Sequence, residues 1–343
     1  MQTELLTIQQ QGHLGVMTLN RPSHLNALSL EMIQGIQQQL QLWQQDASVQ
    51  AVVFKSDHAK AFCAGGDIRY LYDAYQSQST DYRQYFVEEY AMLSQMRNYA
   101  KPIIVLMDGY VLGGGMGLAQ AGHILVSSEK SRFAMPETAI GFFPDVGATH
   151  FLSRLDDIGV YLAVTGEQIS SDDALYLDLI DYLVPSQQFN ALLQALATLP
   201  ELNQAIIQQV IARYIVASEP SGLQNIHALI QQHFSHASMA QIEASLAAET
   251  HPQCQDWAAH VLKLLQQRST VAKQTSLKLQ HVGRGLSLAQ CLQLERDLQD
   301  IWFEHGDLME GVRALLIDKD KQPKWQSHNE QLTQMVEQLT TTA

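Results

Sequence analysis

The chain has 343 residues, of which 46% are apolar and 16% are charged, and its formal net charge is −14. This composition is typical of a folded globular protein and excludes a disordered chain. The acidic balance argues against nucleic acid or an anionic membrane surface as a partner. The three cysteines lie far apart without CxxC spacing, which argues against a disulfide framework or a zinc site and favours a reducing compartment.

The N-terminal sequence MQTELLTIQQQ has no basic segment followed by an apolar one, and it lacks the Arg and Ser enrichment of a transit peptide. The most apolar run, residues 103–126, is interrupted by Asp108, Gln120 and His123 and is rich in glycine. It predicts a buried strand, a loop and a helix, not a membrane span. We therefore expect a cytoplasmic protein.

Strand-length apolar segments alternate with helical patterns through the first half of the chain. We expect strands at 5–9, 15–19, 51–54, 103–107 and 124–126. Helices are expected after the N-cap Ser29, from Ile68, and over 82–99. This alternation indicates an α/β protein with largely parallel strands, in which ligands bind where strands end in glycine loops.

From Val146 the pattern becomes helical. Helices are expected at 149–155 and 158–164 and after Ser170, with a last strand at 182–184. The remaining chain reads as glutamine-rich helices with breaks at Pro200 and residues 219–222, 251–252 and 283–285. His233 and His236 lie three residues apart and are expected on a solvated helix face.

Two glycine-rich loops, residues 65–66 and 113–115, each follow a strand and precede a helix. Adjacent glycines allow a backbone to approach a ligand closely, and one N–H from each loop would form a minimal oxyanion hole. Glu137 and Asp145 follow, each beside a proline, and could transfer protons or attack a carbonyl. The alternative is two tight turns and two surface carboxylates.

Other glycine, serine and histidine chemistries do not fit. Leu118 and Gln120 break the G-x-G-x-x-G/A spacing of a dinucleotide site, and no G-K-[ST] or G-x-S-x-G sequence occurs. No H-x-x-x-H pair comes with a third metal ligand. The sequence therefore predicts neither a metal nor a nucleotide cofactor.

Several motifs resemble the crotonase (enoyl-CoA hydratase/isomerase) superfamily in order and spacing over about the first 200 residues. They are KAFCAGGD at 60–67, Gly109-Tyr110 before the triple glycine, and MPETAIGFFPDVG at 135–147. The resemblance implies a spiral α/β core of ββα repeats. In that core the N–H groups of Gly66 and Gly114 would grip the carbonyl of an acyl-CoA thioester.

The resemblance also implies the substrate-binding residues. Two loops would wrap the CoA, an acid on a helix would touch the substrate hydroxyl, and a glycine would also bind the substrate. These residues are Arg21, Asn26, Leu28, Ala64, Asp67, Ile68, Glu89 and Gly113. Glu89, next to Glu88, could equally be a solvated helix residue.

One departure from the hydratase pattern points to a branch of the superfamily. Hydratases carry a first catalytic glutamate where this chain has Gly117, and addition of water to a double bond needs two carboxylates on that water. The chain keeps the second glutamate, Glu137, and adds Asp145. The segment MPETAIGFFPDVG is similar to the branch that hydrolyses 3-hydroxyisobutyryl-CoA in valine degradation.

The C-terminal region resembles the same branch in Ser276-Leu277-Lys278, EGVRALLIDKD at 310–320 and Pro323-Lys324-Trp325. These residues are expected to serve packing and surface ion pairing, without being catalytic. The resemblance implies an acyl-CoA-binding catalytic core at 1–200 and a helical extension at 201–343 that helps to cover the active site. No cofactor is implied, since CoA is part of the substrate.

Three questions stay open at this stage. Glu137 is either a nucleophile or a general base, while Asp145 orients or deprotonates water. A hydratase or isomerase on the same fold, and a non-catalytic acyl-CoA-binding protein, are the alternative functions. Crotonase relatives commonly form trimers or hexamers, so a homo-oligomer is possible.

Overall fold

The computed structural model describes residues 4–342. These residues form two compact units whose segments interleave along the chain. Unit 1 comprises the described residues up to Asp67 together with Gln84–Phe133 and Ile169–Gln224, and unit 2 comprises Ile68–Arg83, Ala134–Gln168 and the described residues from Asn225 onward. The division into domains at residue 200 remains a prediction.

The main sheet of unit 1 confirms the α/β prediction. Its six strands stand in the order β1 (Leu6–Gln11), β2 (Leu14–Leu19), β3 (Ala51–Ser56), β5 (Ile103–Met107), β7 (Ile124–Ser127) and β10 (Tyr182–Leu183). β1 and β2 form an antiparallel hairpin, and every later pairing in this sheet is parallel. The predicted strands are thus confirmed, with boundary shifts of one or a few residues.

A second, smaller sheet was not predicted. It orders β4 (Ala61–Cys63), β6 (Tyr110–Leu112), β8 (Arg132–Ala134) and β9 (Ile169–Ser170). Strands of two or three residues are too short to show a period of two, so the sequence carries no usable signal for them. β4 and β6 pair in parallel, with Ala61 opposite Tyr110 and Cys63 opposite Val111.

The helices of unit 1 follow local signals. α1 (Leu30–Gln45) begins after Ser29, whose side chain accepts a hydrogen bond from the Met32 N–H, as an N-cap does. The other helices that lie in unit 1 wholly or mainly are η1 (Pro22–His24), α3 (Asp81–Arg97), α4 (Gly114–Gln120), α7 (Ser171–Tyr176), η4 (Ser186–Gln188), α8 (Phe189–Ala197) and α9 (Gln204–Ile211). α10 (Gly222–Phe234) begins in unit 1 and continues in unit 2.

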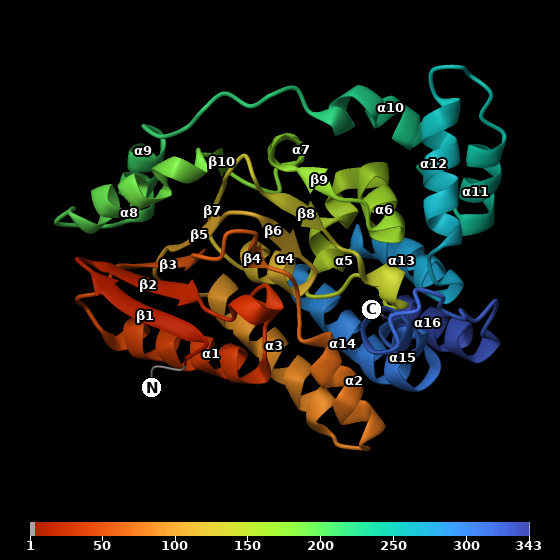
Figure 1. Cartoon of the computed structure of the whole chain (residues 1–343), viewed down its shortest axis with the longest axis horizontal. Helices are drawn as coiled ribbons and strands as arrows, with labels where there is room; N and C mark the ends of the chain where they lie inside the picture. Colours follow the sequence, from red (N-terminus) through yellow and green to blue (C-terminus); the bar gives the residue numbers. More distant parts are fainter. Residues whose placement is uncertain (1–3, 343) are drawn as a thin grey trace. The chain divides into compact units, whose positions relative to one another are not determined.

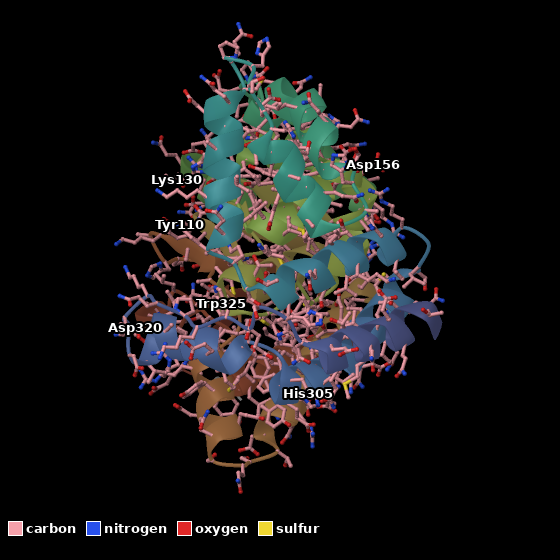
Figure 2. All side chains as sticks on the ribbon, turned by 90° about the vertical axis from the view of Figure 1, so that its right-hand side faces the viewer. Tyr110, Lys130, Asp156, His305, Asp320 and Trp325 are labelled. Carbon is pink, nitrogen blue, oxygen red and sulfur yellow. The ribbon has the colours of Figure 1, made fainter. Side chains whose placement is uncertain are left out.

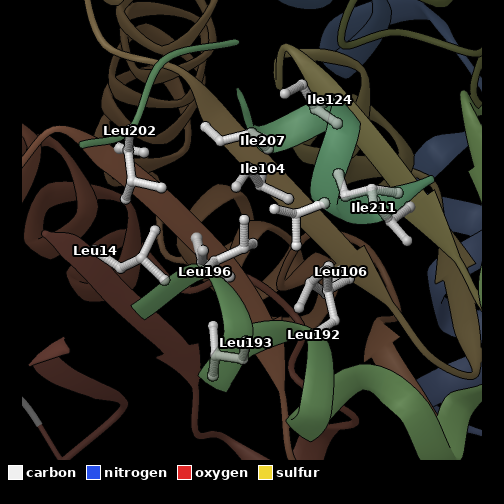
Figure 3. Packing of buried hydrophobic residues seen from close by; sticks show 14 of the residues in the cluster. Leu14, Ile104, Leu106, Ile124, Leu192, Leu193, Leu196, Leu202, Ile207 and Ile211 are labelled. Carbon is white, nitrogen blue, oxygen red and sulfur yellow. The ribbon is translucent and has the colours of Figure 1, made fainter. Parts of the chain in front are cut away.

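One face of the main sheet is covered by α8 and α9. Leu14, Ile104 and Ile124 from the strands form one buried cluster with Leu196 and Ile207 from these helices (Figure 3). All five side chains are fully buried, and each such burial contributes about 1.5–3 kcal/mol to stability. This core makes the sheet a rigid base for the loops at its edges.

Unit 2 is helical in its described part. Its elements are α2 (Ile68–Gln76), η2 (Glu137–Ile140), α5 (Ala148–Phe151), η3 (Ser153–Leu155), α6 (Asp156–Thr165), α11 (Met239–Ala247), α12 (Gln255–Gln266), α13 (Thr270–Gly283), α14 (Leu288–His305), α15 (Leu308–Val312), the π-helical η5 (Arg313–Ile317) and α16 (Glu330–Thr342). α13 packs against α5, α6, α11 and α16, while α11 and α12 lie side by side (Figure 1). The predicted helix breaks at Pro200 and at 219–222, 251–252 and 283–285 are confirmed.

The prediction that His233 lies on a solvated face is wrong. Its side chain is 1% exposed. Its Nδ1 lies 2.8 Å from Ser245 Oγ and its Nε2 lies 3.2 Å from Glu249 Oε2. Burial lowers the pKa of His233, against the opposing effect of Glu249.

The C-terminal motif holds its own loop together. Arg313 pairs with Glu310 at 2.8 Å, Asp318 at 2.5 Å and Asp320 at 2.8 Å. Figure 2 shows Asp320 and Trp325 on the segment between η5 and α16. The motif therefore makes the ion pairs expected of it. Among residues 4–342, no helix is long and apolar enough to cross a membrane.

Candidate active site

The two predicted glycine loops meet at one edge of the small sheet in unit 1. β4 and β6 are parallel neighbours, and each ends just before its glycine loop. A Cβ atom built on Gly114 would lie 3.1 Å from the Gly66 nitrogen and 3.3 Å from the Gly65 carbonyl carbon. Gly65 (φ 114°) and Gly113 (φ 51°) adopt backbone angles that favour glycine. Short parallel strands thus bring together two loops that lie far apart in the sequence.

Hydrogen bonding shows where the Gly66 N–H points. Leu28 N–H donates to the Gly65 carbonyl at 2.8 Å, and Asp67 N–H donates to the Leu28 carbonyl at 2.9 Å. In this parallel bridge the intervening Gly66 turns its own N–H away from Leu28. Gly114 is the first residue of α4, where an N–H has no acceptor within its helix. The pair therefore offers two neighbouring N–H groups, which an oxyanion hole requires, and their role remains a prediction.

The loops around this pair are tied together by polar side chains. Arg21 forms a 2.5 Å ion pair with Asp67 and donates to the Ala27 carbonyl at 3.0 Å. Ala64 N–H donates to the Leu25 carbonyl at 3.1 Å. The structure thus brings Arg21, Leu28, Ala64 and Asp67 together, as predicted, and their contact with CoA remains a prediction.

Asn26 braces the same loop. Its side chain is fully buried and its φ is 58°. It accepts from Arg21 N–H at 2.8 Å and donates to Ser56 Oγ at 2.7 Å and the Phe62 carbonyl at 3.1 Å. These hydrogen bonds attach the loop to β3 and β4. Asn26 therefore holds its loop in place, and its contact with the substrate remains a prediction.

Glu89 belongs to the oxyanion region and is not a solvated helix residue. It is 2% exposed, and its Oε1 would lie 3.1 Å from a Cβ on Gly114. Burial, and next the Glu89 charge, raise the pKa of Tyr85 well above its usual value. The Tyr85 hydroxyl donates to the Leu28 carbonyl at 3.0 Å. A carboxylate beside the oxyanion loops can accept a hydrogen bond from a substrate hydroxyl.

The two predicted catalytic acids, together with Ile68, lie in unit 2. Glu137 begins η2 and is 7% exposed, and Asp145 follows on the same segment and is 6% exposed. The alternative that they are surface carboxylates is thereby excluded. Ile68 is partly exposed and begins α2. Across residues 4–342, no group of three or more His, Cys, Asp or Glu side chains is placed to hold a metal ion.

The segment of Glu137 is held from several sides. The Thr138 hydroxyl donates to the Val164 carbonyl at 3.2 Å, and the Thr138 carbonyl accepts from Ser269 N–H at 3.2 Å. Trp302 Nε1 donates to the Gly141 carbonyl at 2.7 Å. A Cβ on Gly311 of α15 would overlap the Ile140 carbonyl oxygen, so that helix packs directly on η2. The backbone that carries Glu137 is therefore rigidly supported.

Sequence reasoning missed two residues that contact the Asp145 segment. Gln299 Nε2 donates to Asp145 Oδ2 at 3.0 Å. Glu295 accepts from Gly147 N–H at 2.7 Å and from Thr149 N–H at 2.8 Å. Both residues share the apolar face of their helix with Trp302, so helical spacing could have marked them as buried, but no signal in the sequence identifies Asp145 and Gly147 as their partners.

The parallel strands and the glycine loops define an α/β fold, and comparison with known proteins identifies its family. Residues 14–340 match the family Enoyl-CoA hydratase/isomerase. The chain belongs to this family.

Several similar curated proteins are named 3-hydroxyisobutyryl-CoA hydrolase. The mitochondrial 3-hydroxyisobutyryl-CoA hydrolase of Gallus gallus is 37% identical over 93% of this chain and 83% of its own length. The Homo sapiens protein of the same name is 35% identical over 94% of this chain and 84% of its own.

Solved structures share the fold. A carnitinyl-CoA dehydratase from Mycobacterium thermoresistibile has a TM-score of 0.88 at 28% identity, covering 97% of this chain and 96% of its own. An enoyl-CoA hydratase from Rhodobacter sphaeroides has a TM-score of 0.87 at 32% identity, covering 98% and 97%. The predicted crotonase fold is thus confirmed.

Proposed function

We propose that this chain is a thioester hydrolase that converts 3-hydroxyisobutyryl-CoA and water into 3-hydroxyisobutyrate and CoA, a step of valine degradation. The observation that carries the proposal is the pair of acids: Asp145 is buried on the same segment as Glu137, while Gly117 occupies the place of a hydratase's first glutamate. The names of the curated relatives support the same reaction.

The chemistry begins with the carbonyl of the thioester. Its oxygen binds the N–H groups of Gly66 and Gly114, which stabilise the negative charge that develops when the carbonyl is attacked. Loss of one such donor costs about 2.7–4 kcal/mol of transition-state stabilisation in other oxyanion holes. Glu89 accepts a hydrogen bond from the substrate's 3-hydroxyl and so selects β-hydroxyacyl groups.

Glu137 supplies the attack by one of two routes. As a nucleophile it forms a mixed anhydride and releases the CoA thiolate, and water then cleaves the anhydride. As a general base it removes a proton from water, which adds to the carbonyl directly. In both routes a C–O bond forms, the C–S bond breaks, and the thiolate takes a proton that derives from water. Asp145 orients or deprotonates that water.

Hydration or isomerisation of an enoyl-CoA is the second candidate, favoured by the names of the two solved structures. An isomerase needs a single carboxylate, which Glu137 or Asp145 could supply. A non-catalytic acyl-CoA-binding protein is the candidate from another class. CoA binding by itself needs no buried carboxylate, so the retention of both Glu137 and Asp145 speaks against it.

The deciding experiment measures thiol release from 3-hydroxyisobutyryl-CoA beside hydration of crotonyl-CoA. Rapid release without hydration supports the hydrolase, whereas hydration or isomerisation without release refutes it. CoA binding without turnover supports the binding protein. Cys63 and Cys291 are buried, and burial raises the pKa of each thiol to about 12. The protein's own thiol background therefore comes mainly from Cys254, and an enzyme-only blank removes it.

Three further proposals accompany this function. Turnover needs no added cofactor and should survive dialysis against a chelator. A homo-oligomer is expected from the family, and light scattering would test it. The curated relatives named above are mitochondrial, so a cytoplasmic location stays a prediction, to be tested by cell fractionation.

A further inference from the structure

We infer that Gln299 is a positioning residue for Asp145, and that Glu295 holds the turn from which Asp145 projects. The inference rests on the proposed function, because it assumes that Asp145 acts on the hydrolytic water. Every contact that carries it lies within unit 2.

Glu295 and Gln299 lie on a buried face of α14. Glu295, Gln299 and Trp302 are spaced at i, i+4 and i+7, so they share one face of the helix. They are 0%, 4% and 0% exposed. Burial of a carboxylate and an amide is unfavourable unless hydrogen bonds satisfy them. A helix that needed only to pack would carry apolar residues at these positions.

The backbone directly after Asp145 has an unusual conformation. Val146 has a φ of 53° and Gly147 a φ of 91°, so two successive residues adopt left-handed angles. A β-branched residue in this region is strained, and such strain persists only where the surroundings enforce it. Glu295 enforces it, because its two carboxylate oxygens accept from Gly147 N–H at 2.7 Å and Thr149 N–H at 2.8 Å. The direction of the Asp145 side chain therefore depends on Glu295.

The side chain of Asp145 is held by a hydrogen bond from α14. Gln299 Nε2 donates to its Oδ2 at 3.0 Å. A neutral amide donor fixes the rotation of the carboxylate and favours its ionised form without bringing a charge of its own. Trp302 completes the face through its bond to the Gly141 carbonyl. One helix face thus supports the segments of both acids.

The test exploits the near-identical shape of glutamine and glutamate. In Gln299→Glu, a protonated carboxyl at 299 can still donate to Asp145, whereas an ionised one repels it. We expect kcat close to the wild-type value near pH 5 and at least about tenfold lower near pH 8, because the ratio of ionised to protonated carboxyl rises about tenfold with each pH step of one. The decrease must reverse when the same sample is returned to low pH, which excludes misfolding as its cause.

Gln299→Met is the second variant, since it keeps the length but cannot donate. The acid limb of its pH–rate profile should move to a pH higher by about one, with KM within about twofold of the wild-type value. The matched controls are Gln293→Glu and Gln293→Met, because Gln293 is an exposed glutamine of the same helix. Both controls should keep the wild-type profile.

Other titratable groups lie on the elements near the pair, and all variants share them. They lie on α14 and on the elements packed against it, α5, α15 and α16, and on the segment of Glu137. These groups are Glu137, His150, Glu295, Arg296, Asp297, Asp300, Glu304, His305, Glu310, Glu330 and Glu337. Differences between variants at one pH therefore report on position 299.

The outcomes separate the two hypotheses. An active wild type whose Gln299 variants keep its pH profile overturns the inference and leaves the proposed function standing. A wild type that releases no thiol from 3-hydroxyisobutyryl-CoA overturns the proposed function, and with it the inference. Loss of the Gln299→Glu activity at high pH, recovered at low pH and absent from the controls, supports both.

Discussion

Replacement of Gly114 by alanine tests the oxyanion hole most directly. The added methyl group would lie 3.1 Å from the Gly66 nitrogen, 3.1 Å from Glu89 Oε1 and 3.3 Å from the Gly65 carbonyl carbon. It would thus fill the space in front of the Gly66 N–H, where the thioester oxygen is proposed to bind. Gly114 opens α4 without a left-handed φ, so its own backbone angles suit alanine, but these tight contacts require Glu89 and the Gly65–Gly66 backbone to shift slightly.

The magnitude follows from the loss of one donor. Losses of about 2.7–4 kcal/mol per donor correspond to a hundred- to thousandfold decrease in kcat. Thiol release gives kcat and KM, calorimetry gives the affinity for free CoA, and thermal unfolding monitors the fold. We expect a large decrease in kcat, a small decrease in melting temperature from the tight contacts, and a nearly unchanged CoA affinity.

The matched control is Gly222→Ala in the same unit, where the added methyl group would lie 3.7 Å from its nearest neighbour, Asp173 Oδ1. Its activity should equal that of the wild type. If Gly114→Ala folds normally and retains turnover within about threefold of the wild type, the carbonyl does not bind between these two N–H groups.

Three further predictions concern other parts of the molecule. Glu137→Gln should lower kcat by at least about a thousandfold, because the amide can neither attack the carbonyl nor accept the proton of water. Calorimetry should show little change in the affinity for CoA. Near-full activity would exclude both routes for Glu137. Asn26→Ala should lower the free energy of unfolding by about 2–4 kcal/mol in a denaturant titration. The reason is the loss of buried hydrogen bonds at a residue with a left-handed backbone conformation. A change below about 0.5 kcal/mol would show that Asn26 does not brace its loop. Burial holds the pKa of His233 below its value in the unfolded chain. Protonation of this histidine therefore favours the unfolded chain. The stabilisation that is present above about pH 6.5 is lost as the pH falls. The free energy of unfolding should therefore fall more steeply from pH 7 to pH 5 in the wild type than in His233→Gln, and equal slopes would contradict this assignment.

Predictions from the sequence succeeded where the signal is local. Ser29 before the apolar repeat of α1 predicts a capped helix, since the cap and the buried face lie within one segment. The continuous run 103–107 predicts β5. The glycine loops and the two acids were found because each belongs to a short motif of unusual composition.

The sequence could not identify contacts between distant segments. β4 and β6 have three residues each, and their pairing arises only when the main sheet brings them together. His233 has the polarity of a surface residue, yet α10 and α11 enclose it. Gln299 lies 154 positions from Asp145, and Glu295 lies 148 positions from Gly147.

The sequence by itself therefore determined the α/β class, the family and the residues proposed to react with the thioester. Each of these depends on short motifs whose residue types and local backbone preferences can be recognised without the rest of the chain. Only the tertiary structure decided which glycine loops lie side by side, which carboxylates are buried and which side chains hydrogen-bond to them. Burial and hydrogen bonding depend on neighbours from distant parts of the chain, so helical spacing could place Glu295 and Gln299 on a buried face but could not identify Gly147 and Asp145 as their partners.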